Sequence, residues 1–425
     1  MSDATLKLHP AGDSGAVAPD PRETRPNAER LAEQYARLRD VLSAVMAGPY
    51  YAKALAGIDP EGVKGPADLE RLPILRKNDL IDIQAALPPF GGIMNKASRS
   101  DYLFVSPGPI HEPGFLAPDF WRVDRAMRAV GFDAGDIIHN TFSYHLTPGA
   151  WILDSGARAL GCSVIPAGNA PIEQQLLAIA QYGANCYCGT PDFLKTLVEA
   201  YQKSDRGRIP FTKALVTGGA LTPGLRSFFD ASGIHALQCY ATAELGLIAY
   251  ETQPTGHMVV DEDIIVEIVD PETGKAMPSG VVGEVVVTTL RADYPLIRFG
   301  TGDLSAFVDE EQTDGRTGAV LRGWLGRSDE AAKVRGMFVR PSQINALKAQ
   351  FQGLTRARLV IDRSNEKDDI MLFCEFEPDF ALADTVATQD ELAKAFRDLC
   401  HLKTNISIVP QGTVPDDGKV IVDLR

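Results

Sequence analysis

Short apolar runs alternate with amphipathic, helix-length stretches through the middle of this chain, and the alternation constrains the fold more than any other feature. The apolar runs lie at residues 136–139, 162–165, 185–188, 214–216 and 235–239. The helix-length stretches cover 149–160, 172–181, the residues after Thr190-Pro191, and 223–231. Such alternation predicts parallel strands joined by helices. We therefore expect an α/β fold with a largely parallel sheet covered by helices on its faces.

Different sequence textures on either side of this region predict the domain organisation. Residues 1–26 are rich in proline and lack apolar periodicity, which predicts a flexible tail, and a helical opening follows near 27–56. From about residue 255 to 328, short strands separated by turn residues predict a small β subdomain. Residues 27–328 are thus expected to form one large N-terminal domain.

The last 97 residues, 329–425, are expected to form a second domain that joins the first near Asp329. The segments that predict it are helices at 341–351 and 389–400 and strands at 358–361, 370–376 and 406–409. Together they indicate a compact α+β unit.

The charge and the apolar content of the chain indicate which kinds of partner it can bind. With a net charge of −14 and no dense Lys/Arg cluster, the chain is expected to repel nucleic acid and to bind small molecules. No run reaches the roughly 18 to 20 apolar residues that a spanning helix needs, and the start has no signal-peptide core. We expect no membrane association and a cytoplasmic location.

The six cysteines show no spacing typical of a disulfide framework or a zinc site. Cys186 and Cys188 form the one close pair, and two further soft ligands at a suitable spacing are not evident. We interpret the pair as buried strand residues and predict no zinc.

A glycine-rich turn at Thr217-Gly218-Gly219-Ala220 follows one predicted strand and opens a helix. In an open α/β sheet, such loops line the crevice beyond the carboxyl ends of the strands. The small residues either let a flat ligand such as adenine lie close to the backbone, or form an ordinary tight turn.

Two further motifs each end in a carboxylate residue. Glu244, in Tyr240-Ala-Thr242-Ala-Glu244, either holds Mg²⁺ against a triphosphate, for which one protein carboxylate suffices, or is a solvated loop residue. Asp303, in Phe299-Gly-Thr-Gly-Asp303, either accepts both ribose hydroxyls or ends a Gly-Asp turn. The ordered combination of these segments favours the nucleotide-binding interpretation.

Taken in order, the motifs resemble those of the adenylate-forming superfamily, in particular its phenylacetate-CoA ligase branch, over nearly the whole chain after the tail. Residues 72–80 resemble the branch's "LPxxTKxDL" segment, and residues 135–146 its "GDxxHNxxxYGL" segment. Residues 269–290 resemble "DPETG…GELVxTTL", and residues 326–344 resemble "GRSDDMxxxxGxxxxPSQIE". The resemblance implies ATP, Mg²⁺ and CoA as cofactors and a homodimer.

The resemblance also implies roles for individual residues. Lys419 stabilises charge between the acid and the α-phosphate, and Arg327 meets the ribose or a phosphate. Gly218, Gly219, Ala220, Tyr240, Thr242 and Asp303 contact the nucleotide, and Glu244 binds Mg²⁺. The small domain rotates about Asp329, with Arg335 and Gly336 on the CoA side.

The segment that corresponds to the family's phosphate loop departs from its pattern. Residues 106–114 read Ser-Pro-Gly-Pro-Ile-His-Glu-Pro-Gly, where the family has approximately "SSGTTGxP". Pro107 and Pro109 have no N–H to donate, and Glu112 brings a negative charge towards the phosphates. Ala243 removes a further hydroxyl before Glu244.

These observations predict an ATP-dependent ligase that forms an acyl-adenylate and then an acyl-CoA thioester. The alternatives are a non-catalytic acyl or nucleotide binder and an enzyme that uses a pre-activated acyl group. Phe142, Tyr144 and His145 are the expected acid pocket, although aromatic residues at strand ends also form ordinary core. An arylacetic or benzoic acid is the expected substrate, with His145 altering the pocket where the family has glycine.

Overall fold

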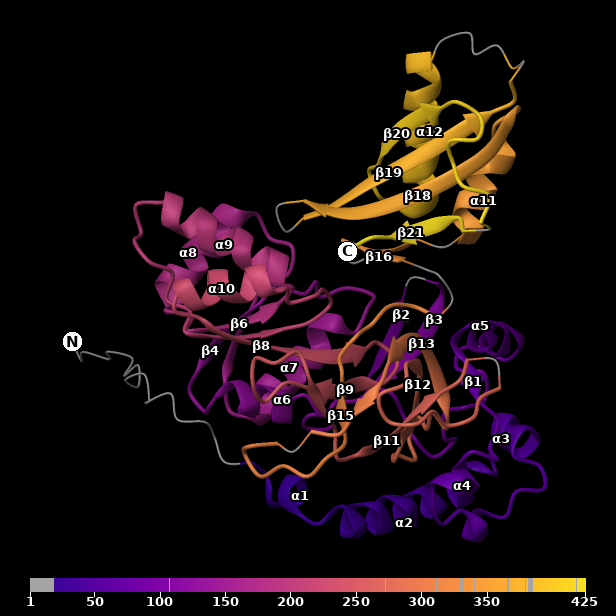
Figure 1. The fold of residues 1–425 in the computed structure, drawn as a ribbon. Helices are drawn as coiled ribbons and strands as arrows, with labels where there is room; N and C mark the ends of the chain where they lie inside the picture. The colour runs from indigo at the N-terminus through magenta and orange to yellow at the C-terminus, as the bar shows by residue number, and fades with distance from the viewer. Residues whose placement is uncertain are drawn as a thin grey trace. The chain divides into compact units, whose positions relative to one another are not determined.

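The computed structural model describes residues 19–106, 108–271, 273–310, 312–328, 332–335, 337–339, 341–364, 367–378, 380, 385–417 and 419–425. The chain divides into two compact units, residues 1–325 and 326–425 (Figure 1).

The N-terminal unit contains a nine-stranded sheet whose one half is parallel. Its neighbouring strands are β5 (Ser163–Pro166), β4 (Ile137–Asn140), β6 (Cys186–Gly189), β7 (Lys213–Val216) and β8 (His235–Thr242), and every adjacent pair runs parallel. The connecting helices are α7 (Gly149–Ala159), α8 (Ile172–Tyr182), α9 (Pro191–Lys203) and α10 (Pro223–Ala231). The predicted α/β fold with a parallel, helix-covered sheet is confirmed.

Both faces of this parallel half are buried, because successive residues of one strand enter different cores. Cys186 and Cys188 of β6 pack with α7 and with α6 (Asp124–Val130). Tyr187, between them, packs on the other face with α8, α9 and α10, which lie together in Figure 1. The interpretation of the two cysteines as buried strand residues is confirmed.

Strand β8 is where the sheet changes direction. It is parallel to β7 but antiparallel to β9 (Gly246–Tyr250), with an irregular register between Tyr240 and Ala241. The sheet continues through β10 (Met258–Val260), β15 (Val320–Leu321) and β14 (Phe307–Val308). Bulges of this kind re-aim side chains, and this one lies within the segment predicted to bind the nucleotide.

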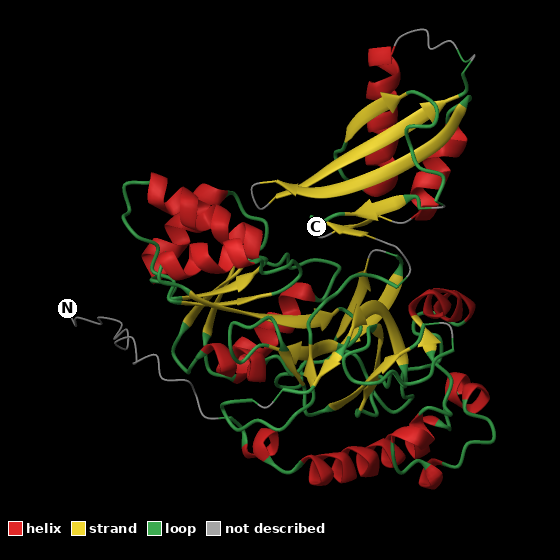
Figure 2. Ribbon diagram, in the orientation of Figure 1, coloured by secondary structure: helices red, strands yellow, loops and turns green. Residues whose placement is uncertain are grey.

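A second sheet has the order β1 (Leu75–Arg76), β13 (Phe299–Ser305), β12 (Gly283–Thr289) and β11 (Ile264–Val269). It shares a core with α2 (Asn27–Val45), α3 (Pro49–Ala54) and α5 (Lys77–Ala86). Two short helical segments, η1 (Pro60–Gly62) and α4 (Pro66–Leu69), connect these helices (Figure 2). Strands β2 (Tyr102–Ser106) and β3 (Ile110–Gly114) form a separate antiparallel hairpin.

Part of the segment 1–26, which we expected to be a flexible tail, is helical. Residues 21–24 form α1 (Pro21–Thr24), with Asp20 and Glu23 making a reciprocal capping box. Glu23 is buried and pairs with Arg316 at 2.9 Å, and Arg22 pairs with Asp263 at 2.8 Å. Ion pairs to residues more than 200 positions away fix this segment, and such pairs leave no local periodicity in the sequence.

The C-terminal unit is α+β. Its main sheet has the order β20 (Asn405–Val409), β19 (Lys367–Phe376), β18 (Leu354–Ser364) and β21 (Ile421–Asp423). Helices α11 (Pro341–Gln350) and α12 (Thr385–Cys400) share one core with this sheet. A small ladder of β16 (Ala332–Val334) and β17 (Met337–Val339) precedes it.

Within the described ranges, no helix combines the length and the apolar character needed to cross a bilayer.

Candidate nucleotide and acid site

Asp303 is held by two donors from different parts of the N-terminal unit. The Tyr240 hydroxyl, at the bulge of β8, donates to Asp303 Oδ2 at 2.7 Å. The Trp324 indole Nε1 donates to Asp303 Oδ1 at 3.1 Å. Asp303 is 7% exposed. Two predicted nucleotide residues, Tyr240 and Asp303, thus lie together although 63 positions separate them.

The backbone conformation of the Gly-Thr-Gly-Asp segment in β13 determines where the Asp303 side chain lies. Gly302 has φ of +73°, a conformation that disfavours residues with a Cβ. The Thr301 hydroxyl donates to the carbonyl of Val285 at 2.9 Å and accepts from the Asp303 N–H at 3.0 Å. The turn therefore fixes the direction of the Asp303 side chain.

Glu244 faces the ammonium group of Lys77, a residue for which the sequence motifs predicted no role. Lys77, the first residue of α5, places Nζ 2.6 Å from Glu244 Oε1, and the Glu244 side chain is 1% exposed. Burial favours the neutral acid, but the nearby Lys77 charge outweighs it and holds the pKa of Glu244 below its ordinary value. The carboxylate is therefore ionised, as a cation ligand must be.

Glu112 lies on β3 of the hairpin that replaces the phosphate loop. The Ser106 hydroxyl donates to Glu112 Oε1 at 2.7 Å, whereas Glu112 Oε2 is buried and has no hydrogen-bond partner among the described residues. Burial, reinforced by the charge of Glu244, raises the pKa of Glu112 to about 8. The one serine that this hairpin keeps from the family's pattern is thus engaged by the hairpin's own carboxyl group.

Helix α5 ties these groups together. Gln84 donates to the His111 carbonyl at 2.8 Å and accepts from the His111 N–H at 2.9 Å. This reciprocal pair of hydrogen bonds joins α5 to the β2–β3 hairpin. Because α5 begins at Lys77 and His111 is next to Glu112, it holds the Lys77 ammonium group and the Glu112 carboxyl group in fixed relative positions. Glu112 is therefore held near Lys77 and Glu244, and both of their charges act on its pKa.

The Gly218-Gly219 turn lies against the predicted acid pocket. Gly218 has φ of +75°, and a Cβ there would stand 3.2 Å from Phe142 Cζ. A Cβ on Gly219 would stand 3.4 Å from the Pro191 ring. The turn and Phe142, predicted separately as nucleotide and acid residues, are therefore neighbours.

Tyr144, two residues after Phe142, belongs to a polar and aromatic cluster. Its hydroxyl accepts from Asn140 Nδ2 at 2.9 Å and donates to Asp154 Oδ1 at 3.3 Å. Its ring meets Trp151 edge-on, with 5.3 Å between centroids. Burial, and then the Asp154 charge, raises the pKa of Tyr144 above its ordinary value.

The other predicted site residues of this unit are His145, Thr242 and Ala220. His145 is exposed, and its Nδ1 accepts from the Thr147 N–H at 3.4 Å. Thr242 ends β8, and its hydroxyl accepts from the Leu245 N–H at 3.3 Å. Ala220 is exposed after the glycine turn.

Lys419 lies on an anchored loop of the C-terminal unit. Arg358, 6% exposed, donates to the Lys419 carbonyl at 2.9 Å and to the Pro415 carbonyl at 2.8 Å, and it pairs with Asp417. The Lys419 side chain is exposed. The backbone that carries the predicted catalytic lysine is therefore fixed, while its ammonium group is open to solvent.

The remaining predictions also fall in the C-terminal unit. Arg327 is half-buried, and the backbone N–H of Arg335 donates to Asp368 Oδ2 at 3.2 Å. Asp329 and Gly336 lie outside the described residues.

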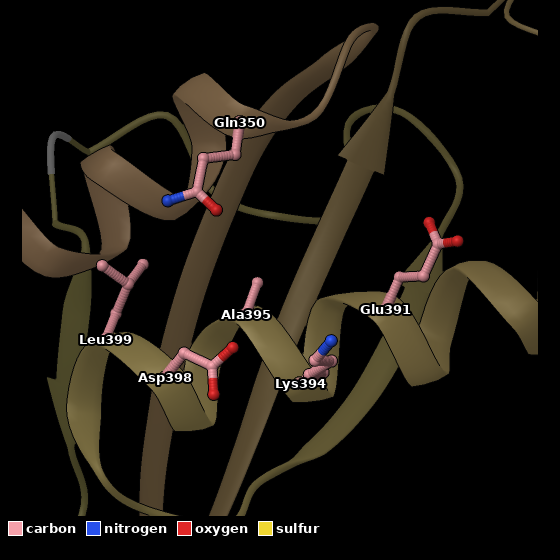
Figure 3. Close-up of a pocket in the computed structure, with 6 residues that line it drawn as sticks. All are labelled: Gln350, Glu391, Lys394, Ala395, Asp398 and Leu399. Carbon is pink, nitrogen blue, oxygen red and sulfur yellow. The ribbon is translucent and has the colours of Figure 1, made fainter.

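A cavity of about 330 Å³ lies in this unit between α11 and α12 (Figure 3). Gln350 faces it from α11, and the α12 residues that line it are Glu391, Lys394, Ala395, Asp398 and Leu399. None of these residues belongs to the motifs singled out in the sequence.

Sequence reasoning missed Lys77, Trp324 and Arg358. Lys77 lies in the 72–80 segment that carries part of the family resemblance, so a signal for it was present. Trp324 and Arg358 act through pairing with distant segments and left no motif. The charge of Glu112 was noted, but its burial and its bond to Ser106 were not foreseen.

The two units define the class of protein. A helix-covered α/β sheet with Tyr240, Glu244 and Asp303 on adjoining segments, followed by a small α+β unit with a lysine near its end, is the arrangement of an adenylate-forming enzyme.

Comparisons with known proteins agree. The family model described as "AMP-binding enzyme" matches residues 122–290. The phenylacetate-coenzyme A ligase of Thermus thermophilus is 30% identical over 95% of this chain and 98% of its own length. That of Escherichia coli K12 is 27% identical over 96% of this chain and 97% of its own. The chain belongs to the phenylacetate-CoA ligase family of adenylate-forming enzymes, and it is an AMP-forming acid–thiol ligase.

A solved structure agrees in fold. The crystal structure of 2-hydroxyisobutyryl-CoA ligase in complex with 2-HIB-AMP and CoA, in the thioesterification state, superposes with a TM-score of 0.82. It is 25% identical, and the match covers 95% of this chain and 91% of that one.

Proposed function

We propose that this ligase activates an aromatic carboxylic acid of the arylacetic or benzoic type with ATP and then transfers the acyl group to the thiol of CoA. In the first step the acid attacks the α-phosphate, and pyrophosphate leaves. In the second step the CoA sulfur attacks the acyl carbon, and AMP leaves. The observation that carries the proposal is the Tyr240–Asp303 hydrogen bond, which joins two nucleotide motifs from different sheets.

Asp303 would hold the ribose. A carboxylate presents two acceptor oxygens, and Tyr240 and Trp324 orient those of Asp303. The two ribose hydroxyls would take one oxygen each. The Gly218-Gly219 turn would let the adenine lie against backbone.

Two cations, a Mg²⁺ ion held by Glu244 and the Lys419 ammonium group, would stabilise the negative charge that develops in the first step. Attack of a carboxylate on a phosphate brings anions together, so preorganised cations lower the barrier. Glu244, ionised and buried, fits one carboxylate ligand for Mg²⁺, and the bound ion would neutralise phosphate charge. Lys419 would supply the remaining positive charge in the adenylation conformation.

The acid would lie near Phe142 and Tyr144. Phe142 borders the Gly218 turn, and Tyr144 stands edge-on to Trp151, so an aryl ring placed there would meet aromatic edges and faces. The polar partners of Tyr144, Asn140 and Asp154, keep its hydroxyl turned towards protein atoms.

AMP release tests the proposal. We expect the purified protein, given Mg²⁺, ATP and CoA, to release AMP with at least one arylacetic or benzoic acid, and to release less with short aliphatic acids. AMP release with aliphatic acids alone would contradict the substrate class. Saturable ATP binding without turnover for any acid would favour a non-catalytic binder, and acyl transfer without ATP would favour a pre-activated substrate.

We also propose that the protein is a homodimer and that it is cytoplasmic. The homodimer implied by the family resemblance predicts a mass of about twice 45.9 kDa in light scattering at micromolar concentration. The cytoplasmic location is the prediction made from the sequence, and fractionation of cells tests it.

A further inference from the structure

Trp324 combines an exposed ring with a hydrogen bond to a buried acid. The residue is 42% exposed, yet its Nε1 lies 3.1 Å from Asp303 Oδ1, and Asp303 is 7% exposed. The other tryptophans are more enclosed, with Trp121 at 4% and Trp151 half-buried. An exposed indole would ordinarily direct its N–H to water, so this geometry calls for an explanation.

The backbone on both sides of Trp324 is fixed to β13 and the residues after it. The Arg322 N–H donates to the Ala306 carbonyl, and the Leu325 N–H donates to the Leu304 carbonyl, each at 2.9 Å. The Ser305 hydroxyl donates to the Gly323 carbonyl at 2.7 Å. Trp324 is therefore positioned by a ladder that runs alongside the strand carrying Asp303.

Gly323 reinforces this placement. It has φ of +93°, and a Cβ there would stand 2.9 Å from the Gly256 carbonyl oxygen. Only glycine satisfies both constraints without a shift of the backbone. The backbone is thus fixed on both sides of Trp324, by the conformation of Gly323 before it and by the hydrogen bond of Leu325 after it.

Tyr240 and Trp324 hold opposite oxygens of one carboxylate. With Oδ2 accepting from Tyr240 and Oδ1 from Trp324, the plane and the rotation of the Asp303 carboxylate are both fixed. A carboxylate held in this way presents its two oxygens in a set orientation, and two acceptor oxygens match a ligand that has two adjacent hydroxyls.

We infer that Trp324 is a positioning and specificity residue for the nucleotide: its N–H sets the Asp303 carboxylate for the two ribose hydroxyls, and its exposed ring forms one wall of the ribose site. The inference deepens the proposed function and rests on Asp303 as the ribose acceptor. It assigns to Trp324 discrimination between ribose and deoxyribose, beyond affinity alone.

Calorimetric titrations of the full chain with AMP and with 3′-deoxy-AMP test this, because neither probe requires a metal. Trp324→Phe keeps an aromatic ring but removes the N–H. We expect it to weaken AMP binding about tenfold and to reduce the preference for AMP over 3′-deoxy-AMP severalfold, because a charge-assisted hydrogen bond that sets the carboxylate is lost. Leu325→Ala, at the neighbouring exposed residue, should change neither quantity.

Unchanged AMP affinity and an unchanged preference in Trp324→Phe would overturn the inference while leaving the proposed function intact. Tighter binding would also overturn it, because Trp324 would then merely fill the site. Failure of the wild-type protein to bind any adenine nucleotide would instead defeat the proposed function.

A measurement on the wild-type protein covers the case in which Trp324→Phe does not fold. Since Trp324 is the most exposed tryptophan, AMP should shield it and reduce acrylamide quenching of tryptophan fluorescence, and 3′-deoxy-AMP should do so only at higher concentration. Saturating AMP that leaves the quenching unchanged would contradict a ribose-site wall.

Discussion

Lys77 Nζ lies 2.6 Å from Glu244 Oε1, so the carboxylate expected to hold a cation with the nucleotide already faces an ammonium group from the start of α5. The pair keeps a buried acid ionised. It also connects the N-terminal helices to the end of β8, where the sheet changes direction.

Removal of one partner of this pair should be costly. We expect Lys77→Met to lower the free energy of unfolding by about 2 to 4 kcal/mol, since it leaves a charge uncompensated in a buried site. Glu244→Gln should cost less, and the double variant should recover much of the loss. Urea unfolding of all four proteins gives the coupling energy, and additive losses would show that the two residues act independently.

Glu112 predicts a pH dependence of stability. Its pKa is raised to about 8 in the folded protein by burial and by the Glu244 charge, so the folded state keeps a proton that the unfolded chain releases above pH 4.5. The free energy of unfolding should therefore fall as pH rises from about 5 to 8, by up to about 1 kcal/mol per pH unit from this group.

Glu112→Gln should remove that slope and should be relatively more stable at pH 8 than at pH 5. Urea unfolding at several pH values measures it, with the exposed Glu173→Gln as the matched control. Parallel pH profiles for wild type and Glu112→Gln would contradict the assignment.

Tyr240→Phe removes the hydroxyl that holds Asp303 Oδ2. We expect the KM for ATP to rise about tenfold with kcat changed much less, because the bond orients a binding group and not a reacting one. Tyr182→Phe, at an exposed tyrosine, serves as control. Equal KM values in the two variants would argue against a ribose role for Asp303.

The middle of the fold was predictable because each strand and helix there carries its own local pattern. The range predicted for α10, 223–231, agrees with the structure. Strand β8 was expected to end at Cys239 but runs to Thr242, because pairing with β9 extends it. The antiparallel continuation from β9 to β14 depends on long-range pairing, which no local pattern encodes.

The candidate site was predictable in part for the same reason. Tyr240, Glu244 and Asp303 stand in motifs with a fixed order, so the sequence indicated their chemistry. Trp324 and Lys77 gain their importance from a hydrogen bond and an ion pair between distant segments. The order of α1 depends on ion pairs of Arg22 and Glu23 with residues far along the chain.

Gly218→Ala should weaken binding of the acid substrate more than it lowers the stability of the fold. The positive φ predicts a loss of about 1 kcal/mol in stability, and the added methyl group would press on Phe142. Gly207→Ala is the matched control, since Gly207 has φ of +83° and open space around its Cβ position. We expect similar stability losses from the two variants but a higher KM for the acid only in Gly218→Ala, measured by AMP release at varied acid concentration. A KM for the acid as low as in Gly207→Ala would separate the turn from the acid pocket.

Acid-dependent exchange of labelled pyrophosphate into ATP is the decisive measurement, because it reports formation of the acyl-adenylate and does not require CoA. We expect exchange with an arylacetic or benzoic acid, a loss of exchange by at least 100-fold in Lys419→Ala, and little change in Lys403→Ala, at another exposed lysine of the C-terminal unit. If the folded protein binds ATP but exchanges no pyrophosphate with any acid, or if Lys419→Ala exchanges it equally well, Lys419-assisted adenylation is ruled out.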